Sequence, residues 1–490
     1  MSTDAAIQAE LREIIDAALR GRLTEDQAAR AVALGAEAAR AVMLAASARI
    51  AELSGKTAPG PHSPSGALPP HAKPTTPKRG RKKPGARVGH DGHRRPTPEP
   101  DERVEVPPLT ACPDCGGPVH APRRRRRRTV EDMPHDTGVK ATEYSIPGHW
   151  CPGCGKHVEP RVSAALPNST IGNRLAALTC VFHYGLGLTI DQTREVLLSP
   201  MRTHVSAGGL VDLWRRIAEA LLPWYEQIGT EARNSAVLHG DETGWRVDGD
   251  THWLWCFGNR TGCVYMIDEG RGSGALKKFF TGAFRGVLIH DFWRPYSSVL
   301  LEGPGEHQCC LAHLLRELDH VDEHTLPHKP PDRAMQWCAF VKMLRRLLRD
   351  GIRLRRRRDF TPQKYASRIA RIDQRLRRLS TAGYRDPDAS RLAERLLRHQ
   401  DELFTFLDRP EADWNNNLAE RMIRPAVILR KNSQCSRSQR GAATQAVLMS
   451  VYRTLKLRGH DPRQTIADAL AAYAATGSLP PLPPPIVADG

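Results

Sequence analysis

The spacing of apolar residues in the first 53 positions predicts two helices. The first has a single apolar stripe at helical spacing, formed by Ile7, Leu11, Ile14, Ile15 and Leu19. Gly21 interrupts this stripe. Thr24 and Gln27 have the spacing of a capping box, so a second, alanine-rich helix is expected to begin there. Such a hairpin either joins two copies of the chain or packs only on itself, and the pattern leaves both readings open.

From residue 235 the pattern changes to short runs of Val, Ile, Trp and Tyr separated by Gly and Asp, which is typical of strands. Five strands are predicted, at residues 236–239, 252–257, 263–267, 286–290 and 308–312. Helices are predicted at 274–280 and 314–321. With a weakly marked helix after the fourth strand, the order is β-β-β-α-β-α-β-α, which a ribonuclease H-like sheet would have.

Helical patterns lie on both sides of the predicted sheet. Residues 189–197 and 206–228 read as two helices about a turn at Pro200, as in a helix-turn-helix motif or in any ordinary helix pair. An Arg-rich helical insertion is expected at about 325–408. Its arginines form either a solvated helix face or a surface that holds DNA. The Pro-rich segment 478–485 is expected to be disordered.

The charge of the chain indicates a polyanionic partner. The 490 residues carry a net charge of +18, and their isoelectric point lies near 9.7. Residues 71–128 hold 16 Lys and Arg against 6 Asp and Glu, a net of +10. A charge run is usually a solvated surface, but its concentration in a Pro- and Gly-rich linker favours contact with phosphates, which releases counterions.

Two matched Cys-x-x-Cys pairs predict a structural zinc site. Cys112 and Cys115 form the first pair, and Cys151 and Cys154 form the second. Four thiolates suit tetrahedral Zn²⁺, and a redox role would need only one such pair. Between the pairs lie six consecutive arginines, which are expected to bind DNA: Arg123, Arg124, Arg125, Arg126, Arg127 and Arg128.

Three acidic residues stand where nucleic-acid chemistry needs them. Asp241 and Asp291 each follow an apolar run that predicts a strand, and Glu420 follows a run of asparagines that favours the start of a helix. Phosphodiester cleavage requires relief of charge on the attacking and leaving oxygens. Two Mg²⁺ ions, or Mn²⁺ in their place, provide this relief when carboxylates hold them. A single Asp at a strand end is usually only a turn residue, so the three gain weight together.

These segments resemble insertion-sequence transposases of the IS-sixty-six type. The resemblance rests on DETGWRVDG around Asp241, HDFWRPY around Asp291, CCLAHLLREL at 309–318 and NNNLAERMIRPAVILRKN around Glu420, and it covers about residues 85–475. It implies that Asp241, Asp291 and Glu420 are a DDE triad, which binds magnesium on a ribonuclease H-like fold. The implied activity is metal-dependent cleavage of transposon ends followed by strand transfer into target DNA.

Neighbouring residues receive weaker assignments. His313 and Arg316 are expected to contact the scissile phosphate, and Arg421 and Arg424 to bind DNA phosphates or to orient Glu420. Glu242 and Asp248 are fallback carboxylates, although Asp248 lies in a predicted hairpin turn. The 129 residues between Asp291 and Glu420 require the insertion to loop out of the catalytic fold. The alternatives are an inactive DNA-binding descendant of a transposase and a nuclease that cuts without joining.

The predicted organisation is multidomain α/β, with a ribonuclease H-like core. The segments are 1–53, N-terminal helices; 54–100, a basic disordered linker; 101–165, a zinc-ribbon-like domain; 166–232, a helical DNA-binding region; 233–460, the catalytic domain with its insertion; and 461–490, a helix and Pro-rich tail. Neither a secretory signal nor a membrane span is visible, so a cytoplasmic protein on nucleoid DNA is expected. The expected partners are double-stranded DNA and a second copy of the chain, with accessory proteins left open.

Overall fold

The computed structural model describes residues 3–19, 23–57, 138–147, 149–153, 156–158, 160–299, 301–303, 305–357 and 359–486. The chain forms two compact units. One comprises Met1–Lys73, Val162–Leu188 and Leu213–Gly490, and the other comprises Pro74–Arg161 and Thr189–Asp212. Among the described residues, no helix is both long enough and apolar enough to cross a membrane.

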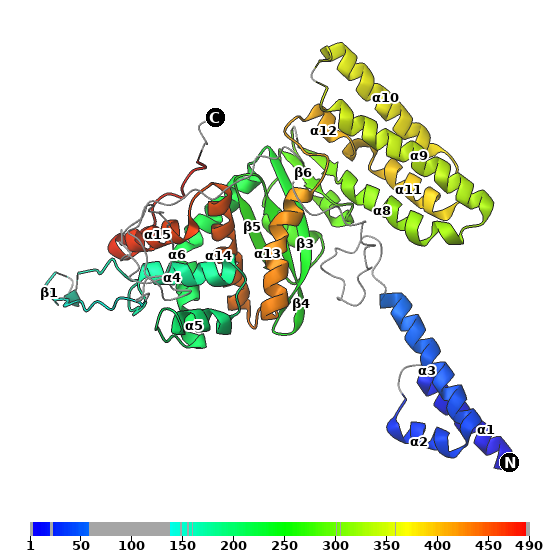
Figure 1. Ribbon diagram of the computed structural model, residues 1–490, viewed down its shortest axis with the longest axis horizontal. Helices are drawn as coiled ribbons and strands as arrows, with labels where there is room; N and C mark the ends of the chain where they lie inside the picture. Colours follow the sequence, from blue (N-terminus) through cyan, green and yellow to red (C-terminus); the bar gives the residue numbers. More distant parts are fainter. Residues whose placement is uncertain are drawn as a thin grey trace, which may run out of the picture. The chain divides into compact units, whose positions relative to one another are not determined.

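A five-stranded mixed sheet lies at the centre of the larger unit (Figure 1). Its strands are β3 (Val237–Val247), β4 (Asp250–Gly258), β5 (Cys263–Asp268), β6 (Val287–His290) and β7 (Glu306–Cys309). They lie in the order β5-β4-β3-β6-β7, with β3, β4 and β5 antiparallel and β6 and β7 parallel to β3. The predicted succession of strands is confirmed, with α7 (Ser273–Phe279) after the third and the short 3₁₀ helix η3 (Arg294–Ser298) after the fourth.

Strand β3 is much longer than predicted. It pairs with β6 only as far as His239, opposite Ile289, but continues along β4 to the turn at Asp248 and Gly249. Asp241 therefore lies within a strand and not at its end, which corrects the expectation. Asp241 still lies just beyond the last parallel pair of β3 and β6, His239 with Ile289, because β6 ends at His290.

Helices from the C-terminal part of the chain cover the sheet. Helix α14 packs along the edge strand β5, where the amides of Cys263 and Tyr265 donate hydrogen bonds to Thr454 Oγ1 and Ser450 Oγ. Helix α13 packs on β3 and β4 (Figure 1). The C-terminal helices are α13 (Asn417–Ser433), α14 (Gln439–Leu457) and α15 (Pro462–Thr476). Two helices that precede the sheet in sequence, α4 (Asn173–Cys180) and the π-helix η2 (Val181–Gly185), pack against α15 and α14.

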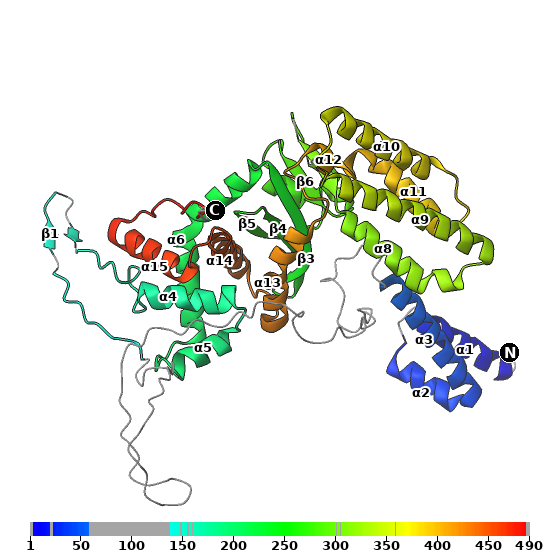
Figure 2. The ribbon, with the colours of Figure 1, turned by 45° about the horizontal axis from the view of Figure 1, so that its top comes forward.

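The Arg-rich insertion is helical, as predicted. Figure 2 shows α9, α10 and α11 side by side, next to α8. Its elements, with α8 leading into them, are α8 (Leu311–His324), η4 (Leu326–His328), α9 (Pro331–Leu354), α10 (Pro362–Thr381), α11 (Pro387–Arg398), η5 (Gln400–Glu402) and α12 (Thr405–Asp408).

This insertion does not loop out of the sheet domain, which corrects the expectation. Its leucines and phenylalanines share one hydrophobic core with Val287, Ile289 and Cys309 of the sheet. Buried Gln308 on β7 donates to the carbonyl of Leu403 and accepts from the amide of Phe406. The insertion thus covers the edge strand β7, whose backbone would otherwise be open to pairing.

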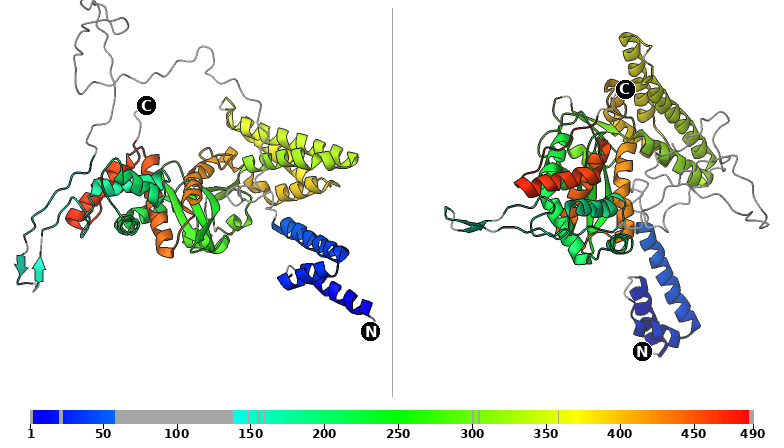
Figure 3. Two further views of the ribbon diagram at one scale, coloured as in Figure 1. Left: turned by 60° about the horizontal axis from the view of Figure 1, so that its bottom comes forward. Right: turned by 60° about the vertical axis from the view of Figure 1, so that its left-hand side comes forward.

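The N-terminal segment forms three helices, whereas two were predicted: α1 (Thr3–Leu19), α2 (Glu25–Ala33) and α3 (Ala36–Thr57), blue in Figure 3. The predicted capping box at Thr24 and Gln27 is present and begins α2. Gly35, with a φ of +108°, divides the expected second helix, because few other residues adopt that backbone conformation. Ile14, Ala18, Ala31, Val42 and Ala45 form the core of this segment.

Cys151, the first cysteine of the second Cys-x-x-Cys pair, lies in a two-stranded antiparallel sheet of the smaller unit. Strand β1 (His149–Cys151) pairs with β2 (Lys156–Val158), so Cys151 ends the first strand. Cys112, Cys115 and Cys154 lie outside the described residues, as does the arginine run 123–128. The predicted helix pair is present as α5 (Ile190–Leu198) and α6 (Ala207–Arg233).

The Pro-rich tail packs against the larger unit through residue 486, contrary to the expected disorder. Leu482 is buried, the Trp224 indole donates to the carbonyl of Pro480 (2.8 Å), and Arg458 Nη1 donates to that of Pro483 (2.6 Å). Proline carbonyls remain free to accept hydrogen bonds, so a segment without regular structure is still fixed in place.

Candidate active site

Two aspartates come together where β3 and β6 stop pairing. Asp291 directly follows β6, and its Oδ1 accepts a hydrogen bond from the amide of Trp293 (2.8 Å). Asp241 lies on β3, and its Oδ1 accepts from the amide of Glu242 (2.9 Å). Each side chain is half-buried. Both aspartates therefore lie between the buried interior and the solvent.

Glu420 reaches the same place from helix α13. It lies in the first turn of the helix, as predicted, and is partly exposed. Asn416 occupies the N-cap position, but its side chain makes no capping hydrogen bond. Instead, its Nδ2 donates to the carbonyl of Gly240 (2.7 Å) and its Oδ1 lies 3.0 Å from His239 Nδ1. The asparagine thus fixes the start of α13 against β3, one residue away from Asp241.

The three carboxylates act on one another electrostatically. Desolvation raises the pKa of Asp241 well above its usual value, and the charges of Glu242, Asp291 and Glu420 raise it further. Desolvation, together with the charge of Glu242, raises the pKa of Asp291 to about 7. Among the described residues, no cationic side chain forms an ion pair with Asp241 or Asp291. The arrangement therefore concentrates negative charge, and within the described chain no ion pair neutralises either aspartate. We call Asp241, Asp291 and Glu420 the carboxylate site.

Glu242, the fallback carboxylate, is fully paired. It is buried, and Arg271 donates to its Oε1 (3.0 Å) while the Tyr296 hydroxyl donates to its Oε2 (3.0 Å). The Arg271 guanidinium in turn lies over the rings of Trp253 (4.5 Å) and Trp293 (4.0 Å). Glu242 is therefore a structural neighbour of the site. Asp248, the other fallback, has a φ of +53° in the turn between β3 and β4, as its predicted turn role requires.

Sequence reasoning missed Arg271 and Tyr296. Both are brought to Glu242 only by the tertiary fold, and no local spacing marks them. One signal existed beside Asp241: a Cβ added to Gly240 would lie 2.9 Å from Cε1 of Tyr296. A glycine in the middle of a strand often marks such a close approach.

Two of the four basic residues expected near the site lie close to Glu420. Arg316 of α8 donates to Glu420 Oε1, and His313 Nε2 lies 3.8 Å from the same oxygen. The pair was expected at the scissile phosphate, and in this structure it contacts the glutamate of the carboxylate site. Arg421 and Arg424 are exposed on α13.

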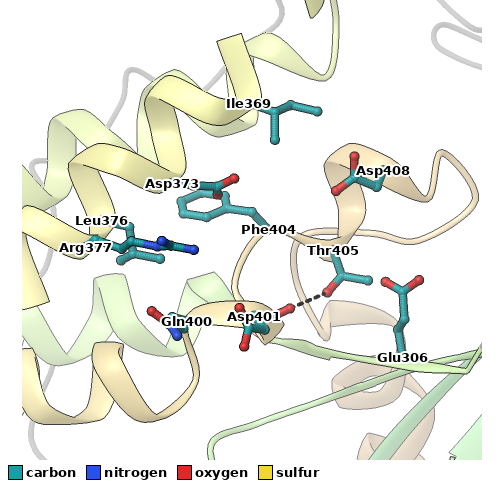
Figure 4. A pocket seen from close by; sticks show the side chains of 10 residues that line it. All are labelled: Glu306, Ile369, Asp373, Leu376, Arg377, Gln400, Asp401, Phe404, Thr405 and Asp408. Carbon is teal, nitrogen blue, oxygen red and sulfur yellow. Dashed lines mark hydrogen bonds between the residues drawn. The ribbon is translucent and has the colours of Figure 1, made fainter. Parts of the chain in front are cut away.

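A separate cleft of about 180 Å³ lies between α10 and the segment from η5 to α12 (Figure 4). Four carboxylates line it, from Glu306, Asp373, Asp401 and Asp408, against the single cation of Arg377. It contains no residue of the carboxylate site. Its negative charge makes it unsuited to a phosphate backbone.

Comparison with known proteins identifies the family. The family described as Transposase IS66 family matches residues 168–444, more than half of the chain, and the chain belongs to this family. The match spans the sheet, the insertion and α13, and so includes every residue of the carboxylate site.

The chain is also similar to uncharacterized proteins of Sinorhizobium fredii (strain NBRC 101917 / NGR234). It is 23% identical to the uncharacterized protein y4hP over 402 residues, which is 76% of this chain and 72% of that protein. It is 24% identical to the uncharacterized protein y4jD over 389 residues, which is 74% of this chain and 75% of that protein.

Proposed function

We propose that the chain is a metal-dependent DNA transposase whose catalytic residues are Asp241, Asp291 and Glu420. Membership in the IS66 family supports a transposase. The observation that carries the residue assignment is the convergence of three carboxylates from β3, β6 and α13 with no cation paired to either aspartate among the described residues. Evolution rarely leaves such a charge uncompensated without a functional reason.

The donor set fits divalent magnesium or manganese. All three side chains offer hard carboxylate oxygens, and desolvation together with the neighbouring carboxylate charges raises the pKa values of the two aspartates, a cost that a bound cation would relieve. When bound, such ions neutralise charge on the attacking and leaving oxygens of a phosphodiester. Arg316 and His313 hold Glu420 in place, while Asn416 anchors the start of its helix. The order and pairing of the strands support a ribonuclease H-like core.

The proposed reaction has two steps at one site. In the first, water attacks the phosphodiester at the transposon end and displaces a 3′-OH. In the second, that 3′-OH attacks a phosphodiester of target DNA. Each step forms one P–O bond and breaks another, so no covalent enzyme–DNA intermediate is required. The four cysteines of the two Cys-x-x-Cys pairs would bind structural Zn²⁺, and the arginines 123–128 would bind DNA.

The test compares Asp241→Asn with Asp248→Asn in full-length protein, using DNA that carries the element's ends. Asp241→Asn should bind the ends like the unchanged protein but lose cleavage by about 10³-fold or more. Asp248→Asn is the matched control, because asparagine tolerates the left-handed backbone of that turn. Unchanged cleavage by Asp241→Asn would refute the assignment. Cleavage by the unchanged protein without joined product would indicate a nuclease.

A further inference from the structure

Five side chains able to bind metals form a second cluster, outside the carboxylate site. They are His290 at the end of β6, His307 and Cys309 on β7, His399 at the end of α11, and Glu402 on η5. His290, Cys309 and His399 are buried, and the other two are partly buried. The proposed reaction uses none of them. We call them the His–Cys–Glu cluster.

The spacing of the ligand atoms fits a single ion. One ligand atom from each of His290, Cys309 and Glu402 lies within 4.8 Å of the other two. Cys309 Sγ is 3.3 Å from Glu402 Oε2 and 3.8 Å from His399 Nδ1. Metal–ligand bonds of about 2.0–2.3 Å at tetrahedral angles place ligand atoms roughly 3.3–3.8 Å apart. Small side-chain shifts would therefore bring four ligands around one centre.

The hydrogen bonds of His290 leave the appropriate nitrogen free for a metal. Its Nδ1 lies within hydrogen-bond distance of the carbonyl oxygen of Asp291. Because a carbonyl can only accept, Nδ1 carries the proton and Nε2 carries the lone pair. Metal-binding histidines usually donate their second ring N–H in this way. His307 Nδ1, 3.0 Å from this Nε2, would donate to the lone pair when no metal is bound.

The donor types and their charges favour zinc over magnesium. Imidazole nitrogen and cysteine sulfur are ligands of Zn²⁺, whereas Mg²⁺ prefers oxygen alone. The Cys309 thiolate and the Glu402 carboxylate would together balance the two charges of the ion. Binding releases the thiol proton of Cys309 to solvent and involves no change of oxidation state.

We propose that His290, Cys309, His399 and Glu402 bind one structural Zn²⁺ that ties the sheet to the helical insertion. His399 is the fourth ligand because its Nδ1 lies 3.8 Å from Cys309 Sγ. Without metal this nitrogen donates to Glu402 Oε2 (2.7 Å), so binding would move the ring proton to Nε2 and lengthen that contact. The ion would join β6 and β7 to the end of α11. Since His290 directly precedes Asp291, it would also fix the strand that supplies one catalytic carboxylate.

The first test is the zinc content of full-length protein. If the Cys-x-x-Cys site is also occupied, the unchanged protein should hold two Zn²⁺ per chain. Cys309→Ala and Glu402→Gln should each remove one equivalent. Cys310→Ala is the matched control and should remove none, because Cys310 is equally buried but its sulfur accepts from the amide of Asn416 (3.1 Å). The proposal is overturned if Cys309→Ala and Glu402→Gln retain the zinc content of the unchanged protein.

A second measurement separates this site from the other proposals. In a Cys112→Ser and Cys115→Ser background, added Co²⁺ should give the thiolate charge-transfer band of one tetrahedral ion. That band should disappear when Cys309→Ala is added. It should persist in Asp241→Asn, whatever that variant does to DNA cleavage. If no such band forms in the background variant, the cluster is a metal-free hydrogen-bond network and the proposal fails.

Discussion

Glu317 and Asp291 are both recessed carboxylates of the same compact unit, but their surroundings are opposite. Glu317, on α8, is 5% exposed and forms ion pairs with Arg391 and Arg395 of α11. Asp291 has no ion pair among the described residues, and desolvation together with the neighbouring carboxylates of Glu242 and Glu420 raises its pKa. In the insertion, charge is compensated where it is buried. At the two aspartates of the carboxylate site, no ion pair among the described residues compensates it.

This difference separates structural from functional charge. A buried ion pair contributes little net stability, but losing one partner is costly because the other charge remains buried. Uncompensated carboxylates destabilise the folded protein until a cation binds, a cost often accepted at active sites. Substitutions in the two regions should therefore change stability in opposite directions.

The largest effect is expected for Glu317→Gln. Arg395 is itself buried, so removing the carboxylate charge weakens the electrostatic compensation of a buried guanidinium. The free energy of unfolding should fall by about 3–5 kcal/mol, measured by urea denaturation. Asp359→Asn, which breaks the exposed pair with Arg357, is the control and should leave the midpoint unchanged. If the Glu317→Gln protein is as stable as the unchanged one, the ion pairs of Glu317 do not compensate its buried charge in the way described.

In metal-free protein, Asp291→Asn is expected to raise the free energy of unfolding, whereas Glu317→Gln lowers it. The pKa of Asp291 is about 7 in the folded state against an ordinary 3.8, so the folded protein holds this proton more tightly than the unfolded chain. The stability that this bound proton contributes is complete below about pH 4 and is lost as pH rises through 7. At pH 8 the variant should be more stable by on the order of 1–3 kcal/mol. Thermal denaturation should show this gain shrinking at pH 5, and a gain independent of pH would contradict the cause given.

Magnesium should reduce the stability advantage of the Asp291→Asn variant. At ten times its dissociation constant, a cation that binds only the folded state adds about 1.4 kcal/mol. The unchanged protein should gain this stability at pH 8 and less at pH 6, where Asp291 is largely protonated. Asp291→Asn should gain almost none. Thermal midpoints with and without Mg²⁺ measure the effect, and equal shifts in both proteins would place the cation elsewhere.

The apolar pattern predicted the strand succession well, because alternating Val, Ile, Trp and Tyr report burial directly. It ended β3 too early, since Glu242, Thr243 and Gly244 are polar or small, although their backbones pair with β4. The polar side chain of Glu242 is satisfied by Arg271 and Tyr296, which lie 29 and 54 residues away. Such long-range compensation leaves no local trace.

The three carboxylates were predictable individually, but their surroundings were not. The position of Glu420 at a helix start followed from the asparagines before it. The side chain of Asn416, however, bonds to β3 and does not cap the helix, because the strand offers the buried carbonyl of Gly240. Likewise the distance of 129 residues from Asp291 suggested a detached insertion. No local pattern indicates that Gln308 bonds this insertion to the sheet edge.

The smallest expected effect concerns the arginines of the insertion, some of which are paired within the described chain and some of which are not. The insertion arginines were expected to form either a solvated helix face or a surface that holds DNA, and in the structure they divide into two groups. Arg345 pairs with Asp319 and Asp322, and Arg355 donates to the carbonyl of Pro410 (2.7 Å), so both hold the fold together. Arg346, Arg349 and Arg353 share one exposed face of α9, and among the described residues none has an acidic partner.

These three arginines are therefore the candidates for binding phosphates. Changing each to Gln should weaken binding to all DNA sequences alike and lower the slope of log affinity against log salt by roughly 0.9 for every phosphate that the variant no longer neutralises. Arg345→Gln is the matched control: it should lower stability, because two carboxylates lose their partner, but leave the salt slope unchanged. Fluorescence anisotropy at several salt concentrations measures the slope. If it stays the same without Arg346, Arg349 and Arg353, this face is only solvated, and uncompensated charge marks function in the carboxylate site but not in the insertion.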